Sequence, residues 1–361
     1  MYQPDQPYNN LPLLPPKAEL ETKATLKACA KAHRALAELK GHLSQIPNPL
    51  LMVDAITLQE ARLSSEIENI VTTQDNLFKA QADPSVATDL ATKEVLSYKQ
   101  ALWHGFNKLK NDGQPFSTRL FVEIVQQIKG GYFDVRTQTD IKIANPVTQD
   151  VIYTPPVGEA LLRDKLANLE HFLNDDTKDL DPLIKLAVGH YQFEAIHPFA
   201  DGNGRTGRIL NVLYLVDQGL LDWPVLYLSR YIIKTKNEYY RGLRSITEAS
   251  AWEAWVVYLL AGIEETATQT LQQVKAIVAL MEATRQCIKE QYPKLPHHEL
   301  VELLFVHPYC KVSFLVDKGI AKRETSTQYL KLLAQLGLLE PVKVWREVYY
   351  LNSPLITLLK Q

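Results

Sequence analysis

The sequence of 361 residues has few cysteines and no segment long enough to cross a membrane. Cys29, Cys287 and Cys310 are far apart and lack the spacing of metal ligands, which argues against a zinc or disulfide framework and indicates free thiols in a reducing compartment. Residues 1–7 have neither the positive start nor the apolar run of a secretory signal. We therefore expect a cytoplasmic protein with no membrane partner.

An excess of charge of either sign is also missing. The 39 lysines and arginines and 41 aspartates and glutamates leave a formal net charge of -2. This argues against a generally basic nucleic-acid coat and against a protein held on a membrane surface, so any basic face must be local. Hydrophobic residues make up 46% of the chain, enough for a sizeable core, and the length predicts two or three domains.

Helical spacing of apolar residues dominates the chain and predicts a mainly α fold. The first 50 residues should form a proline-rich extended arm, residues 1–16, and a helix over 17–43. Residues 51–290 should form an all-helical domain that ends in a long helix. Residues 291–361 should form a separate unit.

The chemically useful residues are concentrated in one stretch, residues 197–208, which joins two segments of helical spacing. The Gly-Asn-Gly turn at 202–204 allows successive N–H groups to point at one anion, and the positive end of the next helix begins there. Arg205 and Arg208 are three residues apart, so both guanidinium groups should lie on one face and suit phosphate oxygens. The stretch predicts a site for more than one phosphate.

Two further residues of this stretch bring other chemistry. Asp201 is a hard oxygen ligand suited to magnesium, and His197 is a base that could take a proton from an attacking hydroxyl. Phe199 should anchor the loop in the core. Taken singly, Asp201 or Asn203 could be a helix N-cap, His197 a buried histidine and the arginines a solvated face. Their co-occurrence favours an anion site with its own base, of a kind other than a P-loop because the Gly-Lys-Ser/Thr ending is missing.

Residues 197–208 resemble the signature of the Fic family, His-x-Phe-x-Asp-Gly-Asn-Gly-Arg-x-x-Arg, at all eight fixed positions. The resemblance covers roughly residues 50–270. Fic proteins have an all-helical core domain, and they usually transfer AMP from ATP to a hydroxyl side chain of a protein. The resemblance therefore implies a protein adenylyltransferase with ATP as its substrate, Mg²⁺ as its cofactor and a Ser, Thr or Tyr hydroxyl of a target protein as the acceptor.

The resemblance also implies a role for each residue of the signature. His197 would be the general base on the target hydroxyl, and Asp201 would hold magnesium. The backbone amides of the turn would bind the α- and β-phosphates, and the two arginines would neutralise the outer phosphates. The implied phosphate-binding residues are Gly202, Asn203, Gly204, Arg205, Thr206, Gly207 and Arg208.

A helix is predicted over residues 54–69, with Asp54 as its N-cap and Asn69 as a suitable C-terminal residue. Glu68 lies at the end of this helix, where the dipole disfavours a carboxylate, and should therefore need a cation. The simplest alternative is a frayed, solvated helix end.

Ser64, Glu68 and Asn69 match the inhibitory motif of Fic proteins, Ser/Thr-x-x-x-Glu-Gly/Asn. The partner implied for Glu68 is Arg208, which would then be unavailable to the γ-phosphate of ATP. Because the motif precedes the signature, the chain resembles the subclass with an N-terminal inhibitory helix. Self-AMPylation stays open, and so does removal of AMP from the target, for which some relatives use this glutamate to position water.

One β-hairpin is predicted before the signature, from alternation at 141–143 and β-prone residues at 151–153. By resemblance it is the flap that covers the active site, pairs with an extended stretch of the target and lines the base pocket. A simple connecting hairpin is the alternative. The implied docking residues are Ile141, Ile143, Val151 and Ile152.

The adenine pocket implied by the resemblance comprises Tyr239, Tyr240 and Thr247. Fic relatives have a tyrosine pair at this distance from the signature, although an aromatic pair in a helix is more often core. Thr247 stands where some relatives have an adenine-binding asparagine, so adenine preference is less firmly implied than phosphate binding. Relatives that handle UTP, GTP or CDP-choline supply the alternative.

The end of the chain is predicted to form three short helices and a hairpin, an order that resembles a winged helix, which serves DNA binding and protein contacts. Lys322, Arg323 and Lys331 could meet phosphates, whereas a homodimer contact or target recruitment is the alternative. The three helices are predicted over 299–306, 312–317 and 325–336, and the hairpin over 342–351.

Two hypotheses for the function remain. The protein is either an AMP-transferring enzyme under its own inhibitory helix, or a nucleotide-sensing regulator that acts on DNA or a protein.

Overall fold

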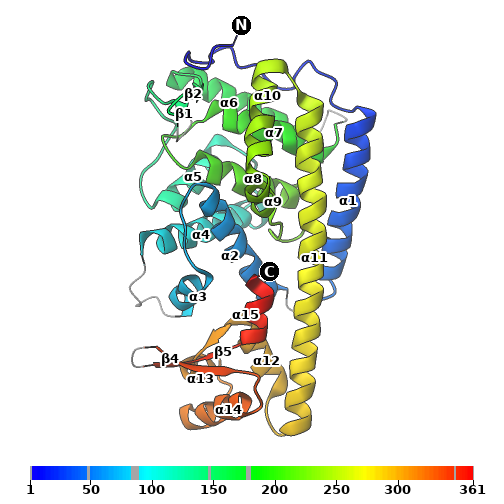
Figure 1. Ribbon diagram of the computed structural model, residues 1–361, viewed down its shortest axis with the longest axis vertical. Coiled ribbons are helices and arrows are strands. Elements are labelled where there is room, and N and C mark those ends of the chain that lie inside the picture. The colour runs from blue at the N-terminus through cyan, green and yellow to red at the C-terminus, as the bar shows by residue number, and fades with distance from the viewer. Residues whose placement is uncertain are drawn as a thin grey trace.

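The computed structural model describes residues 2–46, 49–82, 89–144, 148–175, 180–344 and 347–360. Within these ranges helices predominate, as predicted, and strands are confined to a two-stranded and a three-stranded sheet. Figure 1 shows a helical body at one end of an elongated molecule, a smaller unit at the other, and one long helix that runs along both.

The helical body contains the elements that the signature connects. Its first half comprises α1 (Lys23–Leu43), α2 (Leu50–Ile67), α3 (Gln74–Ala82), α4 (Leu90–Lys110) and α5 (Thr118–Lys129). After a hairpin, β1 (Ile143–Ala144) and β2 (Val151–Tyr153), come α6 (Glu159–Asn174), α7 (Pro182–Ile196), α8 (Asn203–Asp217), α9 (Leu228–Lys234), α10 (Lys236–Ala249) and α11 (Trp252–Gln291).

Helices α7 and α8 form the centre of the body. Both are buried on nearly every side, which is the pattern of a helix surrounded by others rather than one that faces water. Helix α7 packs between α6, α8 and α11, and α8 also packs on α4 and α5. The segment between α7 and α8 is therefore held between two helices that are buried in the centre of the body.

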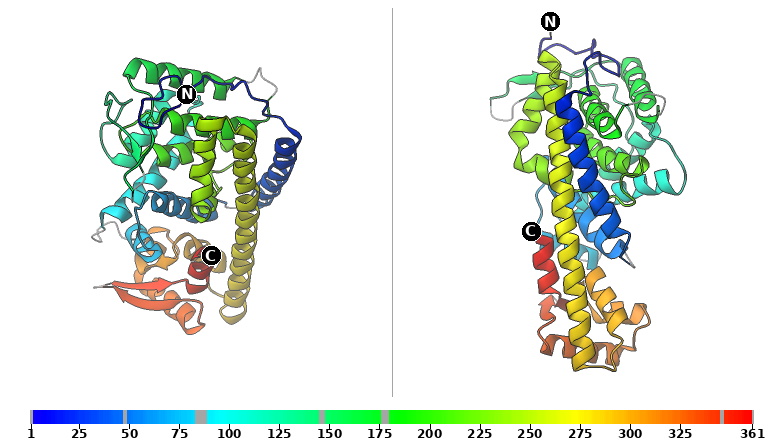
Figure 2. Two further views of the ribbon diagram at one scale, coloured as in Figure 1. Left: turned by 45° about the horizontal axis from the view of Figure 1, so that its top comes forward. Right: turned by 90° about the vertical axis from the view of Figure 1, so that its right-hand side faces the viewer.

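Helix α11 is the long helix predicted at the end of the domain, with 40 residues. Helix α1 packs along it, as the right-hand view of Figure 2 shows. Helix α1 begins at Lys23 rather than at Lys17, because Thr22 takes the N-cap position and its side chain accepts from the backbone N–H of Thr25. The extended arm is correspondingly longer than predicted.

Helix α2, the predicted inhibitory helix, begins four residues earlier than expected. The N-cap position belongs to Pro49, so the prediction that Asp54 caps the helix is wrong. Asp54 lies within the helix, and its carboxylate pairs with Lys99 of α4 at 2.5 Å. Asn69 follows the helix with φ of 63°, in the left-handed conformation typical of a residue after a helix end.

The hairpin pairs β1 with β2 in antiparallel fashion, with Ile143 opposite Tyr153. Ile143, Val151 and Ile152 lie in the strands, whereas Ile141 precedes β1 and is not part of the sheet. Residues 145–147 of the predicted turn lie outside the described residues.

The terminal unit contains the three predicted helices, α12 (His297–Val306), α13 (Val312–Asp317) and α14 (Arg323–Gln335), and the hairpin β4 (Glu340–Val344) and β5 (Glu347–Leu351). The spacing did not predict β3 (Tyr309–Cys310), which pairs with β5 to give the order β3-β5-β4, or α15 (Ser353–Lys360). Helix α15 packs on α2 and α11, and α12 also packs on α2, so the terminal unit contacts α2 directly, from below in the view of Figure 1. Among the described residues, none of the helices combines the length and apolar character that a membrane crossing requires.

Candidate active site

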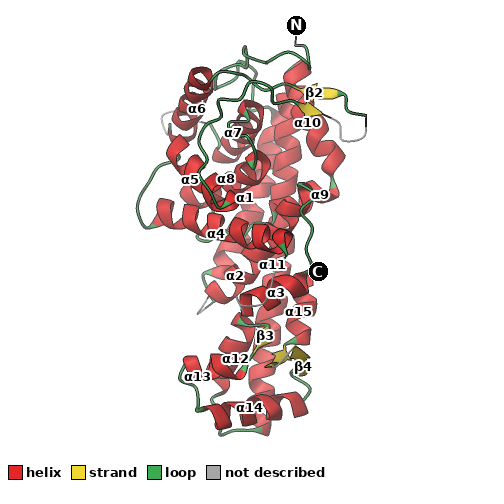
Figure 3. Ribbon diagram, turned by 90° about the vertical axis from the view of Figure 1, so that its left-hand side faces the viewer, coloured by secondary structure: helices red, strands yellow, loops and turns green. Residues whose placement is uncertain are grey.

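A cavity of about 660 Å³ opens between α2, the hairpin, α7 and α10. Its volume is that of a site for a nucleotide-sized ligand. Figure 3 shows β2 beside α10, the two elements that face each other across it. Its walls comprise Ile67, Glu68 and Asn69 of the α2 end, Ile143, Ala144, Ile152 and Tyr153 of the hairpin, Tyr191, Glu194 and Ala195 of α7, Lys236, Asn237, Tyr240, Leu243, Arg244 and Thr247 of α10, and Tyr2 of the arm.

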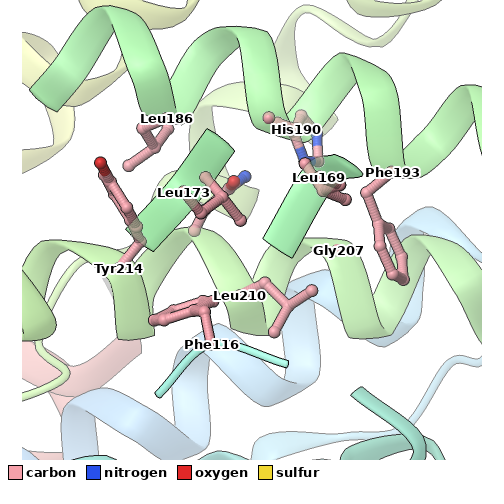
Figure 4. Close-up of a pocket in the computed structure, with 11 residues that line it drawn as sticks. Phe116, Leu169, Leu173, Leu186, His190, Phe193, Gly207, Leu210 and Tyr214 are labelled. Atoms are coloured by element: carbon pink, nitrogen blue, oxygen red, sulfur yellow. The ribbon is translucent and has the colours of Figure 1, made fainter. Parts of the chain in front are cut away.

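A second, internal void lies between α6, α7 and α8 and is shown in Figure 4. Its volume is about 20 Å³, room for a water molecule only. Leucine and phenylalanine side chains line most of it, with His190 at one side (Figure 4). It is a packing defect, and the larger cavity is the candidate site.

The turn before α8 depends on the backbone conformation of a glycine. Gly202 is the residue that caps α8, with φ of 85°, a left-handed conformation that glycine adopts without strain. The alternatives in which Asp201 or Asn203 caps the helix are therefore excluded. The side chain of Asn203 instead holds the loop: it accepts from the N–H of Phe199 at 2.9 Å and donates to the carbonyl of Phe199 at 2.8 Å. The ring of Phe199 is fully buried, as expected.

His197 is held at the end of α7 by its backbone. It adopts φ of 50°, and its carbonyl accepts from Nε of Arg136 at 2.8 Å. Arg136 also donates to the carbonyls of Gln138 and Pro156, which ties the loop to the segments on either side of the hairpin. Burial, helped by the positive charge of Arg136, lowers the pKa of His197 to about 4. The imidazole is therefore neutral near pH 7 and able to accept a proton.

Asp201 forms an ion pair that the sequence did not reveal. Its carboxylate lies 2.6 Å from Nζ of Lys129, at the end of α5, and accepts from the N–H of Gly202. Although burial opposes it, the hydrogen bond and charge of Lys129 hold the pKa of Asp201 below its ordinary value. Asp201 is thus an ionised, largely exposed carboxylate beside the turn. This donor fits Mg²⁺, which is usually held by one or two carboxylates together with substrate phosphates.

The two arginines of the signature go to different carboxylates. Arg205 is 2% exposed and pairs with Glu94 of α4 at 2.7 Å. Arg208 is equally buried, and its guanidinium pairs with Glu68 at the end of α2. The prediction of a shared phosphate-facing surface is therefore not met in this state, because each guanidinium already has an anionic partner.

Arg208 makes the contact that the inhibitory motif predicted. Its Nη2 lies 2.7 Å from Oε1 of Glu68 and donates to the carbonyl of Ser64, and its Nε donates to Oγ of Ser64. A Cβ on Gly204 would stand 2.4 Å from Oε1 of Glu68. The carboxylate of Glu68 therefore lies against the turn itself, in space that only glycine leaves. Burial lowers the pKa of Arg208, but the charge of Glu68 together with those of Tyr239, Tyr98 and Glu194 outweighs it, so the pKa is raised overall.

Thr206 and Gly207 are turned into the fold. Thr206 is fully buried, and a Cβ on Gly207 would stand 2.5 Å from Oε1 of Glu194 and 3.1 Å from the ring of Phe193. Figure 4 shows Gly207 beside Phe193. Gly207 thus allows α8 to approach α7 closely, and the role of both residues as phosphate contacts stays a prediction.

The predicted adenine residues separate into two groups. Tyr240 and Thr247 line the cavity, and Thr247 is hydrogen-bonded to Tyr191 at 3.0 Å. Tyr239 is 2% exposed and shares a hydrogen bond of 2.9 Å with His190 in the core. The core alternative therefore holds for Tyr239, because successive residues of a helix point in different directions. Of the predicted flap residues, Ile143 and Ile152 line the cavity.

Glu194 is a site residue that the sequence reasoning missed. It lines the cavity, and its Oε1 is buried without a hydrogen-bond partner among the described residues. Burial raises its pKa to about 7, with Arg208 acting against this and Glu68 adding to it. The available signal was a carboxylate, the only one in the α7 sequence, three residues before His197.

Helix α2 is fixed by further polar contacts along the face that carries Ser64 and Glu68. Glu60 is 1% exposed, and it accepts from the hydroxyl of Tyr98 and from the hydroxyl and N–H of Ser229. At the other end, Nζ of Lys236 donates to the carbonyl of Ile67 at 2.7 Å, a cation at a helix C-terminus. Helix α2 is thus anchored on both sides of the Arg208 contact.

Glu60 should make stability depend on pH. Burial outweighs its hydrogen bonds to Ser229 and raises its pKa to about 7. Above about pH 4.5 the folded state therefore keeps a proton that the unfolded state releases. The protonated carboxyl stabilises the folded state at low pH, and this stabilisation is lost as pH rises through 7. We expect Glu60→Gln, which cannot ionise, to reduce the fall in unfolding free energy between pH 5 and 8 by on the order of 2–3 kcal/mol.

Chemical denaturation at the two pH values measures this effect. The control is Glu66→Gln, a more exposed position of the same helix that pairs with Arg62, which should leave the slope with pH as in the wild type. Equal slopes for the wild type and Glu60→Gln would show that the buried carboxyl does not titrate in this range.

Three family models match successive parts of the chain. The Fic/DOC family N-terminal model matches residues 26–107, the Fic/DOC family model matches 115–215, and the model of the C-terminal domain of protein adenylyltransferase SoFic-like proteins matches 280–355. Together they cover most of the chain and both motifs of the site.

Curated relatives and solved structures agree with these matches. "Protein adenylyltransferase fic-1" of Caenorhabditis briggsae is 38% identical over 92 residues, 25% of this chain and 17% of the relative. "Probable protein adenylyltransferase aq_aa38" of Aquifex aeolicus is 27% identical over 184 residues, 50% of this chain and 54% of the relative. The chain thus spans about half of the Aquifex protein and less than a fifth of the nematode one.

A Fic family protein from Desulfovibrio desulfuricans has a similar fold. Its crystal structure aligns with a TM-score of 0.58 at 18% identity and covers 93% of this chain and 98% of its own. A segment of Fic-1 from Caenorhabditis elegans aligns with a TM-score of 0.53 over 69% of this chain and 74% of its own, at 19% identity. The signature, the fold around it and the three successive family models lead to one conclusion: the chain belongs to the Fic/DOC family.

Proposed function

We propose that this protein is a protein adenylyltransferase, which transfers the AMP part of ATP to a hydroxyl side chain of a target protein. The observation that carries the proposal is the place of the Glu68 carboxylate. It is bound by Arg208 and lies against Gly204 at the start of α8, so an anion already occupies the position predicted for an outer phosphate. The relatives named protein adenylyltransferase support the same activity.

The residues of the site suit this reaction. The target hydroxyl oxygen attacks the α-phosphorus, its proton passes to the neutral imidazole of His197, and the bond to the bridging oxygen breaks so that diphosphate leaves. The N–H groups at the start of α8 and the arginines stabilise the negative charge of the phosphates. A magnesium ion held by Asp201 and the phosphates would neutralise charge on the leaving diphosphate.

We also propose that Glu68 inhibits the enzyme in the state described. While Arg208 is bound to Glu68 it cannot bind the γ-phosphate, and the carboxylate repels a phosphate placed against Gly204. The side chain of Glu68 is 36% exposed and lines the cavity. It can therefore leave without a rearrangement of the core, and only the end of α2 has to move.

Labelled ATP tests the proposed reaction. In the Glu68→Gly protein, incubated with Mg²⁺ and either α- or γ-labelled ATP, we expect the α-label alone to become attached to the protein itself or to an added target. Transfer of the γ-label would indicate a kinase, and attachment of neither label would contradict the proposal.

A nucleotide-sensing regulator is the second candidate. The observation in its favour is that Lys322, Arg323 and Lys331 are all exposed on or beside α14, in a unit whose helices and hairpin follow the order of a winged helix. DNA binding that weakens with salt and is lost in the triple alanine variant would support it. Self-association that depends on these residues would instead assign the unit to a homodimer contact.

A further inference from the structure

The arm that precedes α1 is bound to the body along most of its length. Its backbone meets the end of β2, where the N–H of Tyr8 donates to the carbonyl of Thr154 at 3.0 Å and the hydroxyl of Thr154 donates to the carbonyl of Pro4. Further along, the buried Nζ of Lys165 donates to the carbonyl of Leu11 at 2.6 Å. Figure 2 shows the arm, in dark blue, crossing the body at the hairpin end. The arm is therefore a part of the folded domain.

Tyr2 extends this arm to the wall of the cavity. Its hydroxyl donates to the carbonyl of Ile152 at 3.0 Å, and its ring stacks on that of Tyr153, with centroids 6.2 Å apart. Tyr8 closes the cluster with its edge against Tyr2 at 5.2 Å. The hydroxyl of Tyr153 in turn donates to the carbonyl of Ala195, two residues before His197. The arm thus supports the hairpin and places Tyr2 in the wall of the cavity.

The position of Tyr2 along α10 shows which end of the cavity it borders. Tyr240, whose pKa burial raises to about 12, is also influenced by Glu68 and Arg208, so it lies toward the phosphate end. Burial raises the pKa of Tyr2 to about 12, and the charges of Glu248 and Arg244, eight and four residues further along the same helix, also act on it. Four residues of a helix rise by about 6 Å. Tyr2 therefore borders the end away from the anion site, where Ile152 and Leu243 also line the wall.

We propose that the arm completes the base subsite of the nucleotide cavity, and that the ring of Tyr2 contacts the base of the bound nucleotide. The inference rests on the proposed function, because it assumes that the phosphates lie at the Gly204 end. A nucleotide bound there places its base toward the opposite end, which is lined by Tyr2, Ile152 and Leu243 together with the charged Arg244. An aromatic ring beside a flat base stabilises binding whichever base is present.

Binding measurements on Tyr2→Ala test the proposal. The experiment uses the full chain with Glu68→Gly as the parent and titrates ATP, AMP and inorganic tripolyphosphate by calorimetry. We expect Tyr2→Ala to lower the affinities for ATP and AMP about tenfold, a typical loss for one base–aromatic contact. The affinity for tripolyphosphate should stay within about twofold of that of the parent. Tyr2→Phe keeps the ring and should bind ATP within about threefold of the parent.

The controls separate the possible failures. Tyr132→Ala removes an aromatic ring that is 88% exposed elsewhere on the surface and should change none of the three affinities. Unchanged ATP and AMP binding in Tyr2→Ala would overturn the inference alone. An equal loss for tripolyphosphate would overturn it by showing a general loss of structure, and tighter ATP binding would show that the arm obstructs the site. If the parent binds tripolyphosphate but neither ATP nor AMP, the proposed function fails and this inference with it.

Discussion

Replacing Glu68 by glycine should raise AMP transfer by between about 5-fold and 150-fold, the range of a coupling free energy of ~1–3 kcal/mol between two sites. The physical reason is that the substitution removes the only acidic side chain that pairs directly with Arg208 among the described residues. It also clears the space beside Gly204. The hydrogen bonds from Arg208 to Ser64 remain, so the guanidinium stays in place and becomes available to a phosphate.

Glu66→Gly is the matched control for this prediction. Glu66 lies in the last turn of α2 and pairs with Arg62 one turn earlier, away from Arg208. The control also introduces a glycine near the same helix end, so it reports any general loosening of α2. Label from α-labelled ATP on the protein measures both variants. Equal labelling of wild type and Glu68→Gly, or an equal rise in Glu66→Gly, would mean that the ion pair does not restrain the reaction.

Replacing His197 by asparagine in the Glu68→Gly protein should lower AMP transfer by about 10²- to 10⁴-fold, the usual contribution of a general base. Asparagine tolerates the left-handed conformation that His197 adopts, so the loop should keep its shape where alanine would strain it. ATP affinity should stay within about threefold, because the imidazole is assigned to the proton and the phosphates are held by α8 and Arg208.

The measurement is single-turnover labelling together with calorimetric titration of ATP. His171→Asn, at an exposed position of α6, is the control and should label like the parent. Since the pKa of His197 lies near 4, its neutral form predominates from pH 6 to 8, and ionisation of this imidazole should not change the rate within that range. Substantial transfer by His197→Asn would remove the assigned base from the mechanism.

The parts of the site that could be predicted are those that lie close together in the sequence. The turn at 202–204 has its own backbone requirements, and the positions of Glu68 and Arg208 are tied to two short motifs of fixed spacing. Asn69, as predicted, lies beyond the end of α2 in the left-handed conformation. Helical spacing likewise predicted the long helix and the terminal unit, because apolar periodicity reports burial directly.

The parts that were missed depend on side chains brought together from distant segments. Lys129 and Glu94 are ordinary charged residues of amphipathic helices, and nothing in their local sequence shows that they pair with Asp201 and Arg205. Tyr239 and Tyr240 are neighbours in the chain but point to the core and to the cavity, which the residue types alone do not distinguish. Tyr2 could not be placed at all, because an extended arm has no periodicity that indicates where it binds.

We infer that one guanidinium, that of Arg208, binds either Glu68 or the γ-phosphate of ATP. The most direct measurement is the ratio of ATP to ADP affinity in the wild type and in Glu68→Gly, because only ATP carries the γ-phosphate. We expect a ratio near one in the wild type and a preference for ATP of at least about tenfold in Glu68→Gly, as for one charge-assisted arginine–phosphate contact. The same ratio in both proteins would contradict it.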